Sequence, residues 1–222
     1  MKLAFLRPAG TFGEAAAMRF APGAEFPPFP SHPAVAAAVE SGMADMGVVA
    51  IENLINGSVP ETLDILIHET TLHIQAEIIL PVVLNLVVKP GTGAGEVRVI
   101  YSHAVALGQC RKFVERCFPK AQLEAALSTT EAVDLALARD GDAGAIATAR
   151  AAQLRGGELL AQGIQDSESN VTRFVVLGRG EPAPTGHDRT SIAFTFSADH
   201  PGALASVLDE FAKAGINCTK IE

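Results

Sequence analysis

Basic residues are few in this chain, and they do not cluster. Its 222 residues include 17 Lys and Arg against 25 Asp and Glu, which gives a formal net charge of -8. Binding to nucleic acid needs clustered positive charge to neutralise phosphates, so we expect no nucleic-acid partner. An anionic ligand must instead be held by a local arrangement of hydrogen-bond donors.

Long apolar runs are also missing. No stretch approaches the roughly 18 consecutive apolar residues that a membrane-spanning helix needs. The segment Met1–Arg7 is too short and too quickly interrupted by polar residues for a signal peptide. We therefore expect a cytoplasmic protein without a membrane partner.

Residues typical of metal, cofactor and nucleophile sites are sparse. Cys110, Cys117 and Cys218 lack CxxC spacing, which favours reduced thiols over a disulfide framework or a zinc site. The histidines form no HxxxH or HExxH pair, and the chain has no Walker loop or Gly-x-Gly-x-x-Gly fingerprint. Neither a metal nor another cofactor is expected. Cys110 lies on an expected helix, two turns beyond Ser102-His103, which argues against a nucleophile pair.

Short apolar runs alternate with Ala-rich stretches of helical period. This alternation is typical of an α/β protein with mainly parallel strands. The expected strands are Lys2–Leu6, Met46–Ile51, Ile74–Leu80, Val82–Val88, Val97–Tyr101, Ala143–Ala147 and Thr172–Leu177. The expected helices are Glu14–Phe20, Ala34–Ser41, Pro60–Glu69, Ala104–Phe118, Glu131–Arg139 and Ala149–Leu154.

Two strands follow one another directly around Pro81, and such a continuous extended passage can carry the chain from one lobe into another. The later strand Thr172–Leu177 can return to the first lobe, which leaves a ligand cleft between two lobes. A Gly/Pro-rich stretch at 179–188 reads as a linker. Beyond it we expect a strand at Thr190–Phe196, a helix at Ala203–Ala214 and a strand from Ile216, about half of a small α+β unit.

Small polar residues recur where expected strands end and helices begin. In open α/β sheets the carboxyl ends of the strands face one crevice, so such helix beginnings can form an anion receptor for a small dicarboxylate. Each residue also fits an ordinary helix cap. These positions are Gly10-Thr11, Asn56-Gly57-Ser58, Ser102-His103, Ser128-Thr129 and Thr148.

Two further groups of polar residues adjoin apolar strands. Glu52-Asn53 follows the apolar run Gly47–Ile51, so its carboxylate and carboxamide can point into the crevice or bond local turns. Asn170-Val171-Thr172-Arg173-Phe174 opens the last expected strand of the two lobes. Thr172 and Arg173 fall on opposite faces of that strand, so one of them can face a ligand.

In their order and spacing these segments resemble the prephenate dehydratase family, followed by the start of an ACT regulatory domain. Nearly the whole chain takes part in the resemblance. The segments that carry it are Ala9–Phe12, Ile51-Glu52-Asn53 with Gly57-Ser58-Val59, Ser102-His103 with Ala106-Leu107 and Gln109-Cys110, Ser128-Thr129, Ala145-Ile146-Ala147, Asn170–Phe174, Pro201–Leu204 and Gly215–Glu222.

The resemblance implies a catalytic domain at 1–178 with the two-lobed fold of type II periplasmic binding proteins. Lobe one comprises 1–75 and 160–178, and lobe two comprises 76–159. The linker at 179–188 precedes a partial α+β ACT domain at 189–222.

The activity implied is the conversion of prephenate to phenylpyruvate, water and carbon dioxide in phenylalanine biosynthesis. Aromatisation drives the reaction, so no electron sink is required. The resemblance places Thr172 nearest the chemistry, with Arg173 and Phe174. Substrate contacts are implied for Thr11, Glu52, Asn53, Ser58, Ser102, His103, Ser128, Thr129, Thr148 and Asn170.

Regulation and assembly are implied by the same resemblance. Phenylalanine is the expected effector, bound by the partial ACT domain of a homodimer or homotetramer. Its expected contacts are Pro201, Gly202, Ala203, Leu204 and Asn217.

The sequence departs from the family pattern near the expected site, which keeps two alternatives open. Arogenate is one alternative substrate, and a non-catalytic two-lobed binding or sensor protein is the other function. The departures are Arg7 in place of Gly, Gly13 in place of Ser or Thr, Ala50 in place of Pro, Leu54 in place of Ser, and Ala104-Val105 in place of Pro-Gln.

Overall fold

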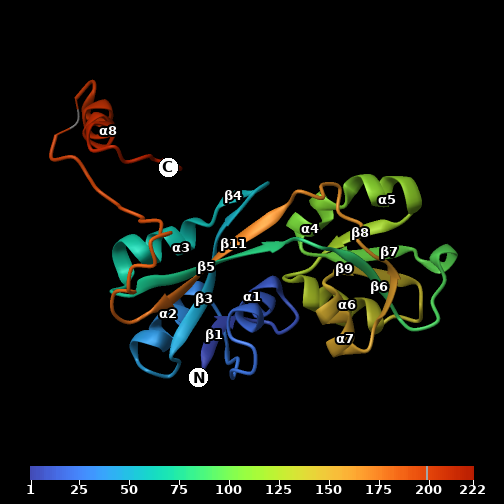
Figure 1. Ribbon diagram of the computed structural model, residues 1–222. Helices are drawn as coiled ribbons and strands as arrows, with labels where there is room; N and C mark the ends of the chain where they lie inside the picture. The colour runs from blue at the N-terminus through green and yellow to red at the C-terminus, as the bar shows by residue number, and fades with distance from the viewer. Residues whose placement is uncertain (199) are drawn as a thin grey trace. The chain divides into compact units, whose positions relative to one another are not determined.

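A computed structural model describes residues 1–198 and 200–222, and the chain divides into two compact units, Met1–Ala183 and Pro184–Glu222. The first unit contains two α/β lobes, each built on its own mixed β-sheet (Figure 1). This confirms the prediction of a two-lobed α/β protein. Among the described residues, no helix has the length and apolar character required to cross a membrane.

Lobe one has a six-stranded sheet in the order β2-β1-β3-β11-β5, with β4 paired to β3. Its strands are β1 (Leu3–Leu6), β2 (Pro28–Phe29), β3 (Met46–Asn53), β4 (Gly57–Ser58), β5 (His73–Pro81) and β11 (Val171–Gly178). Its helices are α1 (Phe12–Phe20), α2 (His32–Glu40) and α3 (Pro60–Asp64), which continues as a π-helical turn, η1 (Ile65–Glu69).

Lobe two has a five-stranded sheet in the order β10-β6-β9-β7-β8. Its strands are β6 (Asn85–Val88), β7 (Val99–Ser102), β8 (Gln122–Ala125), β9 (Ala143–Ala147) and β10 (Glu158–Ala161). Its helices are α4 (Ala104–Gln109), α5 (Arg111–Cys117), α6 (Thr129–Leu137) and α7 (Ala149–Arg155), with a short 3-10 turn, η2 (Ala94–Glu96).

Apolar clusters fill both faces of each sheet. In lobe one, Val49 and Val175 lie in the cluster with residues of α2, and Val48 and Val176 lie in the cluster with residues of α1. In lobe two, one cluster includes residues of α4 and α5, and another includes residues of α6 and α7. Burying both faces requires apolar runs without strict alternation, which is the pattern read from the sequence.

The expectation of mainly parallel strands is wrong. The β1–β2, β1–β3, β7–β8 and β7–β9 pairs are parallel, whereas β11 runs antiparallel to both of its neighbours and β6 does the same. β6 enters lobe two from lobe one, and β11 enters lobe one from lobe two. Each of these strands arrives from the opposite lobe and lies antiparallel to its neighbours. The spacing of apolar residues in the sequence carries no information about strand direction.

Two passages join the lobes, at Val82–Leu84 and at 162–170. They lie side by side: the Val82 amide donates to the Asn170 carbonyl at 2.9 Å, and the Ile164 amide donates to the Leu84 carbonyl at 2.9 Å. β5 belongs to lobe one as far as Pro81, so the chain crosses later than the expected boundary at 75/76. Val82–Leu84, expected to be part of a strand, is instead a connection.

The helix expected at Ala104–Phe118 is broken at Cys110 into α4 and α5. The carboxylate of Asp166, from the returning passage, accepts hydrogen bonds from the Lys112 amide at 3.1 and 3.2 Å. A carboxylate in this position satisfies a free donor and complements the positive helix end, so it stabilises a new helix start. The capping group is distant in sequence, which explains why the helical pattern did not show the break.

In the second unit, the described residues contain one helix, α8 (Ala203–Lys213), and no strand. The helix confirms the expected element, but the strand expected at Thr190–Phe196 is not formed. Ile192, Phe194 and Phe196 are exposed, and the latter two rings pack edge to face with centroids 5.5 Å apart. A strand requires a hydrogen-bonding partner, and none is paired with this segment in the described part of the chain.

Candidate active site between the lobes

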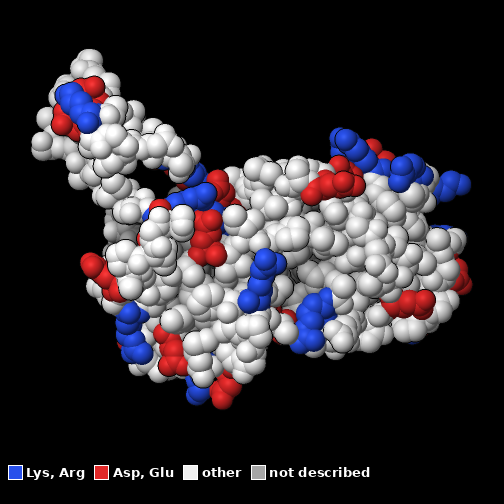
Figure 2. Space-filling view, in the orientation of Figure 1, with Lys and Arg blue, Asp and Glu red and all other residues white. Residues whose placement is uncertain are grey.

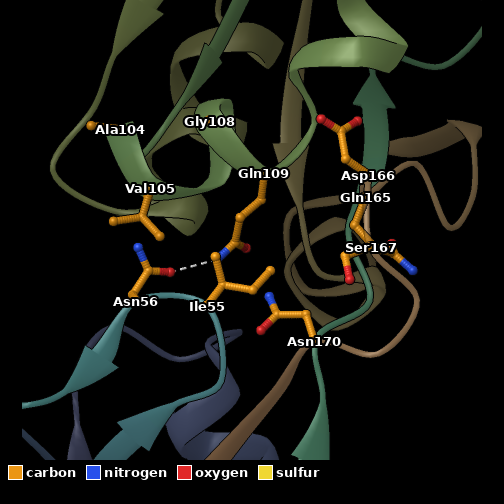
Figure 3. A pocket seen from close by; sticks show the side chains of 10 residues that line it. All are labelled: Ile55, Asn56, Ala104, Val105, Gly108, Gln109, Gln165, Asp166, Ser167 and Asn170. Carbon is orange, nitrogen blue, oxygen red and sulfur yellow. Dashed lines mark hydrogen bonds between the residues drawn. The ribbon is translucent and has the colours of Figure 1, made fainter.

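A pocket of about 530 Å³ lies where the β3–β4 turn of lobe one faces α4 and the returning passage of lobe two (Figure 3). Of the residues that line it in the described chain, only Asp166 is charged. The remaining lining side chains are apolar or neutral and polar. The lining consists of Ile55, Asn56, Ala104, Val105, Gly108, Gln109, Gln165, Asp166, Ser167 and Asn170.

Asn53 is the centre of a hydrogen-bond network behind this pocket. Its Nδ2 donates to Asn170 Oδ1 at 2.9 Å and to Thr172 Oγ1 at 3.0 Å. Its Oδ1 accepts from the Ile55 and Asn56 amides at 3.1 and 3.0 Å, which fixes the orientation of the carboxamide. The sequence left open whether this carboxamide points into the crevice or bonds a local turn, and its Oδ1 bonds the turn.

The side chain of Thr172 is partly buried and is not sealed in the core. It lies opposite Asn53 in the β3–β11 register. Because Asn53 donates to the Thr172 oxygen, the threonine's own O–H remains available as a donor, and no acceptor for it occurs among the described residues. Thr172 is not among the residues that line the pocket, but a hydroxyl with an uncommitted proton can donate to a ligand that reaches it.

Asn170 lines the pocket and is 1% exposed. Its Oδ1 accepts from Asn53, whereas its Nδ2 is buried without a hydrogen-bond partner in the described chain. Figure 3 shows its carboxamide directed toward the pocket. A buried donor left unpaired costs about 1–3 kcal/mol, so an acceptor on a ligand would be favoured here.

Arg173 and Phe174 do not join this network. Arg173 bonds Glu77 through Nε at 2.5 Å and lies 3.6 Å from a Glu52 oxygen. These contacts link β11 to both neighbouring strands. Phe174 is 4% exposed and packs in the core cluster that includes Ile78.

A second contact between the lobes involves the loop that precedes α1. Thr148 Oγ1 donates to the Gly10 carbonyl at 2.5 Å and accepts from the Ala151 amide at 3.0 Å. Thr130 Oγ1 donates to the Ala9 carbonyl at 3.2 Å. The loop of lobe one thus binds the beginnings of α6 and α7 in lobe two.

Gly10 is required at this contact for two reasons. Its φ is +94°, a conformation that L side chains rarely adopt, and an added Cβ would lie 2.9 Å from Ala151 Cα. Glu14 is buried nearby: its carboxylate accepts from the Gly10 amide at 2.6 Å and lies 3.7 Å from Arg150 Nε. The first residue of α1, Phe12, packs against core clusters of both lobes.

The other polar residues expected at helix starts occupy ordinary capping or core positions. Ser102 is fully buried and donates to the Ile146 carbonyl at 2.6 Å. His103 is exposed and caps α4, with Nδ1 accepting from the Val105 amide at 3.4 Å. Ser128 caps α6 by accepting from the Glu131 amide at 3.0 Å, which confirms the predicted capping interaction, and Thr129 is the first residue of that helix.

Thr11 and Ser58 belong to lobe one, and neither is among the residues that line the pocket. Thr11 is the N-cap residue of α1, yet its hydroxyl donates to the Pro8 carbonyl at 3.1 Å instead of capping the helix. Ser58 lies on β4, opposite Glu52 in the sheet register. In the second unit, Gly202 is the N-cap of α8, which begins with Ala203-Leu204, while Pro201 and Asn217 are exposed.

Sequence reasoning missed Asn56 and Gln109 as site residues. Gln109 Nε2, on α4, donates to Asn56 Oδ1 at 2.9 Å, so lobe two contacts the β3–β4 turn of lobe one (Figure 3). Asn56 lies in a segment that the sequence marks as a helix beginning, and Gln109 lies in a segment that carries the family resemblance. Their uncharged side chains gave no separate signal in the sequence.

Cys110 is buried in lobe two, and burial, with a smaller contribution from the nearby Asp166 carboxylate, raises the pKa of its thiol to about 12. A thiol with this pKa is protonated at neutral pH and is a poor nucleophile. Among the described residues, His, Cys, Asp and Glu form no group suited to a metal ion. The face drawn in Figure 2 shows basic and acidic side chains interspersed over both lobes.

Comparison with known proteins gives a consistent assignment. The prephenate dehydratase family pattern matches residues 3–182. The bifunctional chorismate mutase/prephenate dehydratase of Aquifex aeolicus is 41% identical over 223 residues, which span all of this chain and 60% of that protein. The prephenate dehydratase of Mycobacterium bovis is 40% identical over 235 residues, which span all of this chain and 72% of that protein.

Among solved structures, the prephenate dehydratase of Arthrobacter aurescens in complex with L-Phe superposes with a TM-score of 0.93 at 34% identity. The match covers all of this chain and 75% of the other. The sequence pattern, the identity along this whole chain and the fold therefore agree, and the chain belongs to the prephenate dehydratase family.

Proposed function

We propose that this chain converts prephenate to phenylpyruvate in the cleft between its lobes, with the Thr172 hydroxyl as the donor to the departing ring hydroxyl. The observation that supports this role is the hydrogen bond from Asn53 Nδ2 to Thr172 Oγ1. It occupies an acceptor site of the hydroxyl and leaves the proton of Thr172 for the substrate.

The reaction breaks two bonds of the substrate. The ring carboxylate leaves as carbon dioxide, and the electron pair of its C–C bond enters the ring as the C–O bond to the ring hydroxyl breaks. One proton is taken up, so the products are phenylpyruvate, carbon dioxide and water. Hydroxide is a poor leaving group, and a hydrogen bond from Thr172 that strengthens as the C–O bond breaks lowers the barrier.

Neutral donors hold the substrate in this proposal. Because the pocket lining carries no cationic side chain in the described chain, amides must stabilise the substrate carboxylates. The unpaired Nδ2 of Asn170 is the first candidate, since a carboxylate oxygen there would satisfy a buried donor. The mostly apolar wall formed by Ile55, Ala104 and Val105 would favour loss of the charged ring carboxylate as neutral carbon dioxide.

Several residues of the expected site take positioning roles in this account. Thr148 holds the lobes together through Gly10, and Ser102 bonds within lobe two. Arg173 holds β11 beside Glu52 and Glu77. Phe174 packs the same strand against the core. Arg173 and Phe174, which follow Thr172, therefore hold in place the strand that carries the hydroxyl.

The direct experiment is an assay of phenylpyruvate formation from prephenate by purified chain that has been dialysed against a chelator. The proposal expects turnover without added metal or cofactor. Calorimetry on the same sample measures prephenate binding. Tight binding without turnover would overturn the catalytic proposal and favour a two-lobed binding or sensor protein.

Arogenate is a second candidate substrate because the pocket's charged side chain is a carboxylate. Arogenate carries an ammonium group where prephenate carries a keto group, and Asp166 would attract that charge. The carboxylate also accepts from the Lys112 amide, which directs part of its charge toward α5. Comparing kcat/KM for the two substrates decides between them; a higher value for arogenate would overturn the preference for prephenate.

Phenylalanine regulation, homo-oligomer formation and a cytoplasmic location complete the proposal. The relative from Arthrobacter aurescens was solved in complex with L-Phe, which supports phenylalanine as an effector. The second unit exposes Ile192, Phe194, Ile216 and Ile221, and burial against another chain would remove this apolar surface from water. Light scattering with and without phenylalanine tests the assembly. A monomer under both conditions would exclude it.

A further inference from the structure

A hydrogen bond crosses the cleft from one lobe to the other between two residues that line the pocket. Gln109 Nε2, at the end of α4, donates to Asn56 Oδ1 in the β3–β4 turn at 2.9 Å. The dashed line in Figure 3 marks this bond between the two lobes. Both side chains line the pocket, so the bond lies where a substrate would pass or be enclosed.

The turn that carries Asn56 is also the segment that orients Asn53. The amides of Ile55 and Asn56 donate to Asn53 Oδ1, and Asn53 Nδ2 donates to Thr172 Oγ1. Leu54, Ile55 and Asn56 are otherwise exposed to solvent. A continuous set of hydrogen bonds therefore runs from Gln109 in lobe two to the hydroxyl of Thr172 in lobe one.

The surroundings of the bond make it sensitive to what fills the pocket. Val105 lies beside Asn56, and Ile55 lies beside Gln109, as Figure 3 shows. These apolar side chains are 42% and 52% exposed, respectively. A ligand that covers them would exclude water from the Gln109–Asn56 bond, and a hydrogen bond becomes electrostatically stronger when water is excluded.

We propose that Asn56 is a positioning residue for the reaction of the proposed function. Its carboxamide binds Gln109 across the cleft, which orders the 54–57 turn over the substrate and holds Asn53 and the Thr172 hydroxyl in register. Asn56 acts through Asn53 and does not contact the reacting atoms. The inference rests on prephenate turnover by the wild-type chain.

A double-mutant cycle tests the pairing. A neutral hydrogen bond of ordinary strength corresponds to a loss of about three- to ten-fold in kcat/KM when it is removed, and Asn56→Ala should show a loss of this order. The double variant with Gln109→Ala should be no worse than Gln109→Ala alone. Gln153→Ala, an exposed change on α7, is the matched control and should leave kcat/KM unchanged. Independent, multiplicative losses from Asn56→Ala and Gln109→Ala would overturn the proposal.

A conservative variant separates positioning from a general structural effect. Asn56→Asp keeps an oxygen that can accept from Gln109 but adds negative charge beside a doubly negative substrate. It should retain kcat within about two-fold and raise KM, while Asn56→Ala lowers kcat. Equal kcat losses in the two variants would contradict the role assigned to the acceptor.

A spectroscopic readout distinguishes failure of the inference from failure of the proposed function. In protein labelled with ¹⁵N-glutamine, the side-chain amide resonance of Gln109 should shift in Asn56→Ala and shift less in Asn56→Asp. This measurement needs no substrate. If wild-type protein does not turn over prephenate, the proposed function fails; if the Gln109 resonance is the same in Asn56→Ala and wild type, the cross-cleft bond fails.

Discussion

Asn53 and Thr172 are register partners on adjacent antiparallel strands, and their side chains are joined by a 3.0 Å hydrogen bond from Nδ2 to Oγ1. Two amides of the following turn fix the other end of the Asn53 carboxamide. Asn53 is therefore a donor to the threonine oxygen, which leaves the threonine O–H to point away from the Asn53 nitrogen. The backbone of two strands and one turn, with no charged side chain, sets up the proposed donor.

Reversing the polarity of this bond should disable the hydroxyl while leaving it in place. Asn53→Asp keeps oxygens for the Ile55 and Asn56 amides but presents a second oxygen to Thr172. The threonine then donates to the carboxylate instead of the substrate, so we expect kcat to fall about 100-fold, as for loss of a preorganised donor. Steady-state kinetics measure this. Wild-type kcat in Asn53→Asp would contradict the orientation role.

The contact between Thr148 and Gly10 should be important for stability. Thr148→Val removes the hydroxyl that donates to a buried carbonyl and caps α7, so we expect a loss of about 1–3 kcal/mol in the free energy of unfolding. Thr129→Val is a control at the start of α6, because the Thr129 hydroxyl, unlike that of Thr130, makes no hydrogen bond to lobe one in the described chain. Urea denaturation measures both; equal stabilities of Thr148→Val and wild type would contradict the contact.

Much of the fold follows from the sequence. Apolar runs and helical periods located β1, β3, β5, β9 and β11, and the passage around Pro81 indicated two lobes. The sequence did not predict the short strands β2 and β4, the largely exposed β8 or the partly buried β10, because two to four residues or a mixed polar pattern carry little periodic signal. Strand direction in the sheets depends on where the chain crosses between lobes, which local pattern does not specify.

Sequence reasoning named part of the hydrogen-bond network beside the pocket. Asn53, Asn170 and Thr172 were named from the sequence, and the structure brings all three into one network. The sequence suggested that the helix beginnings together bind an anion. Thr148, at the beginning of α7, instead donates to the Gly10 carbonyl in the contact between the lobes. Asn56 and Gln109 are far apart along the chain, so their hydrogen bond forms only when the two lobes face each other and could not be read from the sequence.

Thiol reactivity should separate the cysteines by environment. Cys110 is buried with a pKa of about 12, whereas Cys117 and Cys218 are exposed. Alkylation of native protein at pH 8 should label the two exposed thiols, and Cys110 should react only after denaturation. Mass spectrometry of peptides reads the positions. Rapid labelling of Cys110 in native protein would contradict its burial.

The stability contributed by Glu40 should depend on pH. Hydrogen bonds from the Thr70 hydroxyl and the Thr71 amide lower the pKa of the Glu40 carboxyl from its ordinary 4.5. This stabilisation is present above that value and is lost as the pH falls through the lowered pKa of the folded state. Thr70→Val should therefore reduce Tm at pH 7, and this difference should become smaller in acid, where only the hydrogen bond from the Leu72 amide to the Thr70 hydroxyl remains to be lost. Thr71→Val, which keeps its amide, is the control; a difference for Thr70→Val that persists undiminished in acid would contradict the assignment.

The central claim is that the Thr172 hydroxyl assists departure of the ring hydroxyl, and steady-state turnover of prephenate by Thr172→Val tests it most directly. Valine keeps the shape of the side chain and removes the donor, so we expect kcat to fall about 100-fold or more with KM changed less than about three-fold. Thr172→Ser, which restores a hydroxyl, should recover most of the rate. A Thr172→Val enzyme with the wild-type kcat would contradict the account.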